Sequence, residues 1–412
     1  MSSAAAYLAC SWTWCIGMFF PVYLIRDFGA PGWLAFAIPN VIGAASVGPV
    51  MAQPGRTGGA AGLMQRHARM MRAFSFVTVL FHVSFLSWLM AIVLGSEAVG
   101  GQGYMGPGFA MLALWLAMLA AAAPWRWLIG LGGPLVLAGS MAFAWLAWRG
   151  GALQPPRPSS MGNFGISSLL MASPALAFGF LFCPYLDMTL LRMRRDDAGL
   201  SRREGTSAFM LGFLVIFPAL IGFTMLYAES LLHQRLSWWI LGHIVLQSVF
   251  TMGLHWKALL ESGAADPSGQ EPSTNPRLGG ASSDGRSSGR VALIATALLL
   301  ALCTGALPYL GSLRPGYGMH RLSYELFLSA YALPFAAYVW IVMLGEAGQG
   351  GAGTEAEEAA RRRRRKVWAV SCIAAAPILL FGYVLQHWWA VPIGVAIPAA
   401  GVIPLTARRA GR

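Results

Sequence analysis

Charged residues are scarce in this sequence: Asp, Glu, Lys and Arg make up 11% of the 412 residues, whereas 57% are hydrophobic. A soluble globule of this length needs far more polar residues to cover its surface, so that class of protein is excluded. The composition instead predicts an integral membrane protein, with the lipid bilayer as its main partner.

Paired cysteines are also missing. The five cysteines (Cys10, Cys15, Cys183, Cys303 and Cys372) all lie inside apolar runs, and none belongs to a CxxC pair. This pattern favours neither a disulfide framework nor a zinc knuckle, and the cysteines are expected to be small core residues.

The positive charge is not clustered as nucleic-acid binding requires. The net charge is +13, but the basic residues lie between the apolar runs and are not gathered on one folded segment. A nucleic-acid partner is therefore not expected.

Apolar stretches of the length that crosses a bilayer recur along the chain. A spanning helix needs roughly 20 mostly apolar residues, and about twelve segments meet this condition. They cover approximately residues 5-25, 32-52, 73-95, 108-125, 127-148, 166-190, 207-228, 236-257, 291-311, 322-344, 367-385 and 388-407. The pairs within 108-148 and 367-407 are separated by so few residues that either could be a re-entrant hairpin.

The distribution of basic residues predicts the orientation of these segments. Cytoplasmic loops hold most Lys and Arg; with the N-terminus inside, 23 of the 29 basic residues lie on the cytoplasmic side and 6 on the other. The sequence therefore predicts a multi-pass protein of a bacterial inner membrane, with both termini cytoplasmic.

Two cytoplasmic loops are long and poor in apolar residues. Residues 262-290 are mostly Gly, Ser and Pro, and residues 345-366 end in an acidic and then a basic block. Neither can bury a core, so both are predicted to be disordered linkers, the second leading into an extra helix pair at 367-407.

The first apolar segment is repeatedly interrupted. The stretch "SWTWCIGMFFPVYLIRDFGAPGWLAFAIPNVIGAASVG" contains Gly17, Pro21, Gly29, Pro31, Gly32, Pro39 and Gly43. In hydrocarbon every backbone N–H and C=O needs a partner, so a true break occurs only where the freed groups meet protein, a cavity or a ligand. The alternative is a simple Pro kink with Gly17 at a close helix contact.

This opening, a Trp-x-x-Gly break, the turn "RDFGAPG" and a second helix, resembles transporters with the LeuT-type fold of the amino acid, polyamine and organocation superfamily. The nucleobase-cation and sodium-solute symporter branches are the most similar. The resemblance implies an all-α bundle of two inverted five-helix repeats, here about 5-148 and 166-344, in one membrane domain spanning 1-412. The resemblance places Trp14, Ile16, Gly17 and Met18 in an unwound zone. It makes Ile16 an ion ligand and the other three candidate solute-binding residues.

Segment six tests the inverted repeat, because it should also be broken. "LLMASPALAFGFLFCPYLDMTLLRMRR" contains Pro174, Gly179 and Pro184, and its end is similar to the Pro-Asp-aromatic-Ser/Thr-Arg motif of nucleobase-cation symporters. Pro184 precedes Asp187 by three residues where that motif has one. Gly179 and Asp187 are candidate solute residues. Asp187 could also act as a gate or an ion-coupling carboxylate, and the alternative is an interfacial anchor beside Arg194 or Arg195.

Segment eight carries further polar candidates. Ser248 and Thr251 share one helical face and, by the resemblance, supply oxygens to a sodium ion held against the first break. His243 is a candidate solute residue, whereas His82 and Asn40 are expected to make helix-to-helix hydrogen bonds.

The expected function is a secondary transporter that couples a small polar or nucleobase-like solute to Na+ or H+, with no other cofactor. The alternatives are a membrane sensor or assembly subunit, and a membrane enzyme with a zinc site on the outer face. The residues available for that zinc site are Glu229, His233, His320, Glu325 and His387. The oligomeric state is left open.

Overall fold

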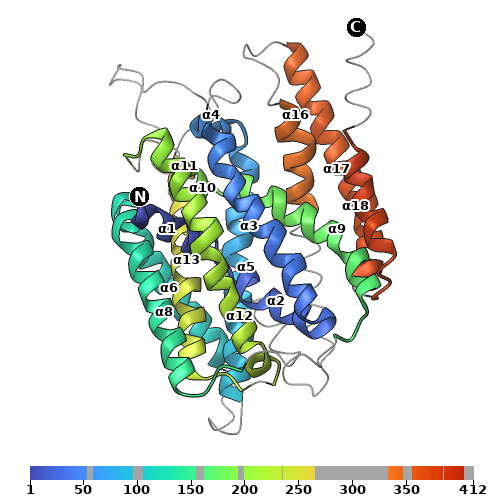
Figure 1. Ribbon diagram of the computed structural model, residues 1–412. Helices are drawn as coiled ribbons and strands as arrows, with labels where there is room; N and C mark the ends of the chain where they lie inside the picture. The colour runs from blue at the N-terminus through green and yellow to red at the C-terminus, as the bar shows by residue number, and fades with distance from the viewer. Residues whose placement is uncertain are drawn as a thin grey trace.

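The fold consists of α-helices with short 3-10 and π-helical segments, and no strand occurs in the described ranges (Figure 1). The structure is a computed structural model. It describes residues 1–52, 59–95, 105–154, 162–193, 199–233, 235–264, 333–346, 355–383 and 385–402. The prediction of an all-α helical bundle is confirmed for these ranges.

The helices follow the predicted segments in chain order. Their bounds are α1 (Ser2–Trp12), α2 (Cys15–Phe28), α3 (Ala30–Ala52), α4 (Gly59–Arg66), α5 (Ala68–Gly95), α6 (Gly106–Ala121), α7 (Trp125–Trp127), η3 (Leu128–Gly132), α8 (Gly133–Arg149), α9 (Ile166–Phe182), η4 (Cys183–Leu186), α10 (Met188–Arg192), α11 (Arg202–Leu211), η6 (Gly212–Ile216), α12 (Phe217–Leu232), α13 (Trp238–Ala264), η7 (Val339–Met343), α16 (Leu344–Glu346), α17 (Glu355–Tyr383) and α18 (Ala390–Ala400).

Several of these helices can cross a membrane. Six stretches are long and apolar enough: Ala30–Ala52, Ala68–Ala91, Trp125–Arg149, Ile166–Leu186, Arg202–Leu232 and Glu357–Tyr383. The bent pair α1 and α2 makes a seventh if it forms one span. The chain is therefore a membrane protein with several spans. The predicted number of twelve is not confirmed, because α6 and α18 are short, α13 is not among the six, and segment 291-311 lies outside the described residues.

Close backbone approaches hold the bundle together. A Cβ atom on Gly43 of α3 would overlap the carbonyl oxygen of Phe180 and lie 2.8 Å from Leu181 Cα, both on α9. A Cβ atom on Gly133 of α8 would likewise overlap the backbone of Tyr7 on α1. Small residues at these crossings let the helices pack backbone against backbone, as is common in membranes.

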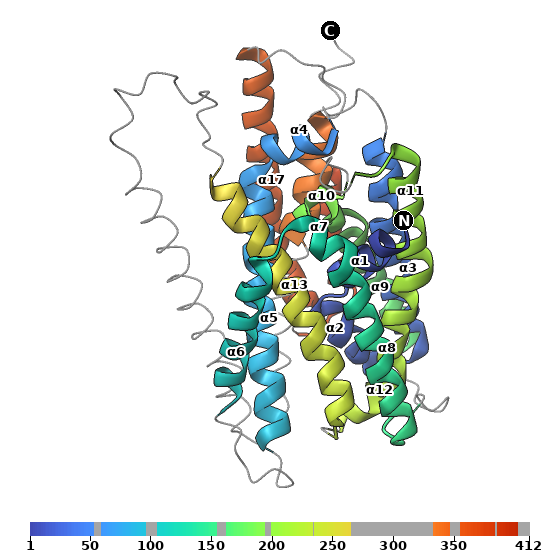
Figure 2. The same cartoon turned by 90° about the vertical axis from the view of Figure 1, so that its left-hand side faces the viewer.

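Helix α13 packs against α5, α6 and α8, and the views of Figures 1 and 2 place it beside them. One end of the bundle, at the top of Figure 1, brings together α4, α10 and the first turns of α11 and α17. These elements carry many of the basic residues that the sequence assigns to the cytoplasmic side: Arg66, Arg192, Arg202, Arg203 and Arg361 to Lys366.

The prediction of a disordered linker at residues 345-366 is wrong in part. Residues 355–366 are not a disordered stretch but the first three turns of α17. Three glutamates (Glu355, Glu357 and Glu358) occupy its first turn, where negative charge interacts favourably with the helix dipole. Glu358 also pairs with Arg362 one turn later, at 3.4 Å. Of the first linker, 262–264 belong to α13 and the rest lies outside the described residues.

Replacing Gly43 by Ala should destabilise the protein by about 1–3 kcal/mol, because the new methyl group overlaps the backbone of α9. Gly222→Ala is the matched control, since Gly222 lies inside α12 and a Cβ there meets nothing within 4 Å. Thermal unfolding in detergent checks both variants. Equal midpoints for the two would contradict the close α3–α9 contact.

Candidate functional site

The first predicted segment is broken after Trp12. Helices α1 and α2 meet at 60°, and between them Trp14 is extended, with φ −76° and ψ 168°. The Thr13 hydroxyl donates to the carbonyl of Ala9 at 2.7 Å. The Trp14 indole N–H donates to the carbonyl of Ser11 at 2.9 Å. The Trp14 side chain thus takes the place of the helical N–H that the Ser11 carbonyl would have met in a continuous helix, whereas the Ala9 carbonyl also keeps the backbone N–H of Thr13 at 3.1 Å.

His82 of α5 caps the other side of the break. Its Nε2 atom accepts a hydrogen bond from the backbone N–H of Cys15, the first residue of α2, at 3.2 Å. Its Nδ1 atom lies 2.8 Å from the carbonyl of Thr78, so Nδ1 carries the proton. The expectation that His82 bonds a neighbouring helix is confirmed.

The position of the break differs from the prediction. Trp14 lies in the break, but Ile16, Gly17 and Met18 form the first turn of α2 and are not unwound. Glycine permits a break without imposing one, and here the break occurs where Thr13, Trp14 and His82 supply hydrogen bonds. The Gly17 carbonyl nevertheless lacks its usual helical donor, because Pro21 has no N–H.

The second interruption lies in the sixth segment. Helix α9 runs through Gly179 to Phe182, the short 3-10 helix η4 follows, and Asp187 is extended before α10 begins. Pro184 cannot donate to the carbonyl of Phe180, which favours the end of α9 here. Asp187 Oδ1 accepts the backbone N–H of Thr189 at 2.7 Å and so caps α10.

The two interrupted segments contact each other. The Tyr7 hydroxyl on α1 donates to the carbonyl of Thr189 on α10 at 3.2 Å, and both residues are fully buried. On the other half of the first segment, the Tyr227 hydroxyl of α12 donates to the carbonyl of Met18. The half-helices are therefore held by side chains from elements distant in the sequence.

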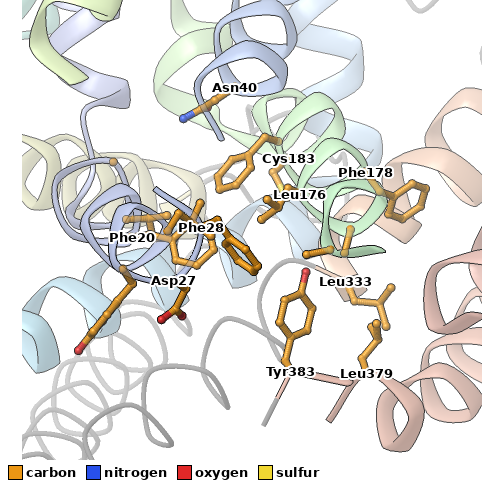
Figure 3. A pocket seen from close by; sticks show the side chains of 18 of the residues that line it. Phe20, Asp27, Phe28, Asn40, Leu176, Phe178, Cys183, Leu333, Leu379 and Tyr383 are labelled. Atoms are coloured by element: carbon orange, nitrogen blue, oxygen red, sulfur yellow. The ribbon is translucent and has the colours of Figure 1, made fainter. Parts of the chain in front are cut away.

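A cavity of about 110 Å³ lies between the two segments. Trp12, Trp14, Ile16 and Gly17 border it from the first segment, and Gly179 and Cys183 from the sixth. Figure 3 shows rings from both sides of this space, with the Tyr383 hydroxyl turned toward the part that Phe28 and Leu333 border. Most of the lining is aromatic or aliphatic.

The polar side chains at the cavity wall include both hydrogen-bond donors and acceptors. The Trp12 indole N–H donates to Asn40 Oδ1 at 2.7 Å. Because an indole nitrogen only donates, the facing Asn40 atom is its oxygen, and the amide N–H groups remain for another partner. Trp388 Nε1 is buried with no hydrogen-bond partner in the described part of the chain. Arg26 and Asp27, also at the wall, pair with each other at 2.9 Å.

The cavity gathers only some of the candidate residues. Trp14, Ile16, Gly17 and Gly179 border it, whereas Met18, Asp187 and His243 do not. His243 is fully buried, packs its ring edge-on against Phe223 at 4.9 Å, and has no hydrogen bond on either nitrogen within the described ranges. The structure therefore separates His243 from the solute candidates.

One member of the predicted hydroxyl pair on α13, Thr251, contacts α1 near the first break. Thr251 Oγ1 donates to the carbonyl of Cys10 on α1 at 3.4 Å. Ser248, three residues earlier on the same face, is fully buried, and its hydroxyl has no partner among the residues described. Oxygen atoms from α1 and α13 thus meet close to the interruption.

The described residues of the alternative zinc site do not lie together as a group of three. Glu229 pairs with His233 at 3.2 Å on the surface, and His387 stacks on Phe381. His320 and Glu325 lie outside the described residues. No group of three His, Cys, Asp or Glu side chains that could hold a metal occurs in the described part of the chain.

Sequence analysis missed His255. It is fully buried on α13, packs against Trp14 with ring centroids 5.3 Å apart, and places Nε2 3.8 Å from Asp187 Oδ2. It lies near the end of the predicted segment 236-257, and no motif in the sequence singles it out. Only the register of α13 against α10 brings it to the second interruption.

Comparison of the chain with family models, with curated proteins and with solved structures finds no match. The function therefore has to be inferred from the site itself.

Replacing His82 by Leu should destabilise the fold by about 1–3 kcal/mol, because the buried Cys15 N–H then loses its acceptor. His82→Gln retains an acceptor and should lose less. His243→Leu is the matched control, since this equally buried histidine makes no hydrogen bond to the described residues. Thermal unfolding in detergent ranks the three variants. A His243→Leu protein as unstable as His82→Leu would show that the cap is not the cause.

Proposed function

We propose that the chain is a secondary transporter of the LeuT type, which carries a small nucleobase-like solute across the membrane together with a cation. The observation that carries this proposal is the cavity bordered by both interrupted segments. A helix broken inside a membrane leaves backbone groups available for a ligand, and transporters built in this way bind solute at such breaks.

The chemistry of the cavity wall supports a flat, neutral solute. Aromatic rings offer stacking surfaces, and the free amide N–H groups of Asn40 offer donors for carbonyl or ring-nitrogen acceptors. The nearby charges, Arg26 and Asp27, already compensate each other. The volume of about 110 Å³ lies well below the range for drug-sized ligands and suits a single small ring system.

The oxygen atoms around Cys10, Ser248 and Thr251 support a cation beside the first break. One backbone carbonyl and two hydroxyls come from two helices, and Na+ prefers such hard oxygen ligands. A cation there would connect α1 with α13 and stabilise one arrangement of the half-helices. Solute binding and cation binding would then favour the same conformation, which is the basis of coupled transport.

Uptake into proteoliposomes tests the transport proposal, with labelled uracil, cytosine, adenine and hypoxanthine as probes. Gly17→Leu should lower uptake at least about tenfold, because the side chain enters the cavity while a Cβ there meets only Ile221 Cγ2 at 3.8 Å. Gly108→Leu, at an exposed site with nothing within 4 Å of a Cβ, is the control and should transport normally. Binding of a probe without uptake by the unaltered protein would favour the sensor alternative.

Removing both hydroxyls, Ser248→Ala with Thr251→Ala, should abolish the stimulation of uptake by Na+ over choline, since two oxygen ligands are lost without a change of charge. Ser87→Ala is the control, because its buried hydroxyl also lacks a partner in the described ranges but lies on α5. Na+ stimulation that survives the double substitution would exclude this oxygen cluster as the cation site.

A further inference from the structure

Asp187 and His255 face each other at the second interruption. Both side chains are fully buried, and Asp187 Oδ2 lies 3.8 Å from His255 Nε2. The other polar atom of each side chain is held: Asp187 Oδ1 accepts from the Thr189 N–H at 2.7 Å, and His255 Nδ1 lies 3.0 Å from Ser75 Oγ. The two facing atoms have no hydrogen-bond partner within the described residues.

We propose that Asp187 and His255 form a binding site for a proton that is coupled to transport in addition to the cation at Ser248 and Thr251; this rests on the proposed function. A separation of 3.8 Å exceeds the 2.7–3.2 Å of an N–H···O hydrogen bond. Oδ2 and Nε2 therefore face each other without a hydrogen bond between them. A proton taken from water would bind at Nε2 or Oδ2 and bridge the pair, and it would return to water on the opposite side.

Buried charge makes the pair sensitive to this one proton. An ionised carboxylate beside a neutral imidazole is an unpaired charge away from water, which is costly. One added proton converts it into an imidazolium–carboxylate pair, or into a carboxyl group hydrogen-bonded to imidazole, and neither arrangement carries net charge. Ser75 supports either tautomer of His255, because its hydroxyl both donates and accepts.

Other titratable groups near the pair are already engaged. Arg192, one turn along α10, pairs with Glu261 at 2.6 Å, and Lys257 pairs with Glu261 at 3.1 Å. The His82 nitrogens are occupied by Cys15 and Thr78, and the Tyr7 hydroxyl donates to Thr189. Further charged groups on the packed elements are Arg66 of α4, which bonds Gly62, Arg69 and Arg72 of α5, and Arg149 of α8. The Arg26 and Asp27 side chains of α2 pair with each other, and the Tyr185 hydroxyl bonds Ser46.

Proton binding at this pair would act on both interruptions. Asp187 is the cap of α10, so a new hydrogen bond to His255 draws α10 toward α13 by on the order of 1 Å. His255 also packs against Trp14, the residue in the first break. The protonated pair would hold the cytoplasmic half of segment six in place, and release of the proton would free it to move.

Histidine NMR tests proton binding without any solute. In the full-length chain labelled with 15N-histidine, His255→Gln identifies the His255 signals among the seven histidines. Asp187→Asn keeps a side-chain oxygen for the α10 cap but removes the negative charge, so the proton affinity of His255 should fall at least about tenfold. His243, on the same helix, is the internal control and should not change.

A fall in the proton affinity of His255 that is smaller than tenfold in Asp187→Asn overturns the proposal. A His255 that stays neutral down to about pH 4, well below the usual histidine range, also overturns it. An equal shift at His243 would also overturn it, because the effect would then be a general change of structure.

Proteoliposomes with an imposed pH gradient test the coupling, using the nucleobase probe that the unaltered protein accepts. Asp187→Asn and His255→Gln should each lose uptake driven by the gradient but retain exchange of internal for external probe, which needs no net proton movement. Gradient-driven uptake that persists in either variant overturns the coupling role. If the unaltered protein carries no probe, the transport proposal fails, and the NMR result still decides whether the pair binds a proton.

Discussion

Every backbone N–H and C=O inside a bilayer needs a partner, and this requirement decides where the chain can be interrupted. At the first break the amide of Cys15 is satisfied by a histidine from α5, and carbonyls at the end of α1 accept from Thr13 and Trp14 side chains. At the second, the carboxylate of Asp187 satisfies an amide at the start of α10. Both breaks exist because polar side chains replace the missing helical bonds.

Small residues let neighbouring helices pack closely against each broken segment. Gly43 lets α3 lie against the backbone of α9, and Gly133 lets α8 lie against α1. The cavity beside these segments is bordered mainly by aromatic and aliphatic side chains, with the polar side chain of Asn40 held by Trp12. A mostly apolar wall can recognise a ligand by its shape and by ring stacking more readily than by its charge.

Polar groups on α13 connect the cavity region to the rest of the bundle. Thr251 contacts the end of α1, and His255 faces the cap of α10 and the ring of Trp14. One helix therefore contacts both interruptions through side chains one turn apart. An ion or proton bound along this helix would change the free energy of both half-helices at once, which is what coupling between two sites requires.

Local sequence patterns predict many of the helices and both of the interrupted segments. Runs of about 20 apolar residues predict most of the helices, and Gly and Pro correctly indicate interruptions in the first and sixth runs. The same residue types do not interrupt α3, which is continuous through Pro39 and Gly43. The helical start of α17 was missed, because its Glu–Arg pairing stabilises a helix that has no apolar core to reveal it.

Hydrophobicity and backbone chemistry are properties of neighbouring residues, so the sequence by itself determined that the chain is an all-α membrane protein with interruptions in two segments. Only the tertiary structure decided that the first break lies at Thr13 and Trp14 and not at Gly17, and that His255 faces Asp187. The physical reason is that a hydrogen-bond partner for a broken helix can come from any part of the chain: His82 lies 67 residues from the amide it caps. Which partner is in reach depends on the packing of whole helices, and no local pattern records it.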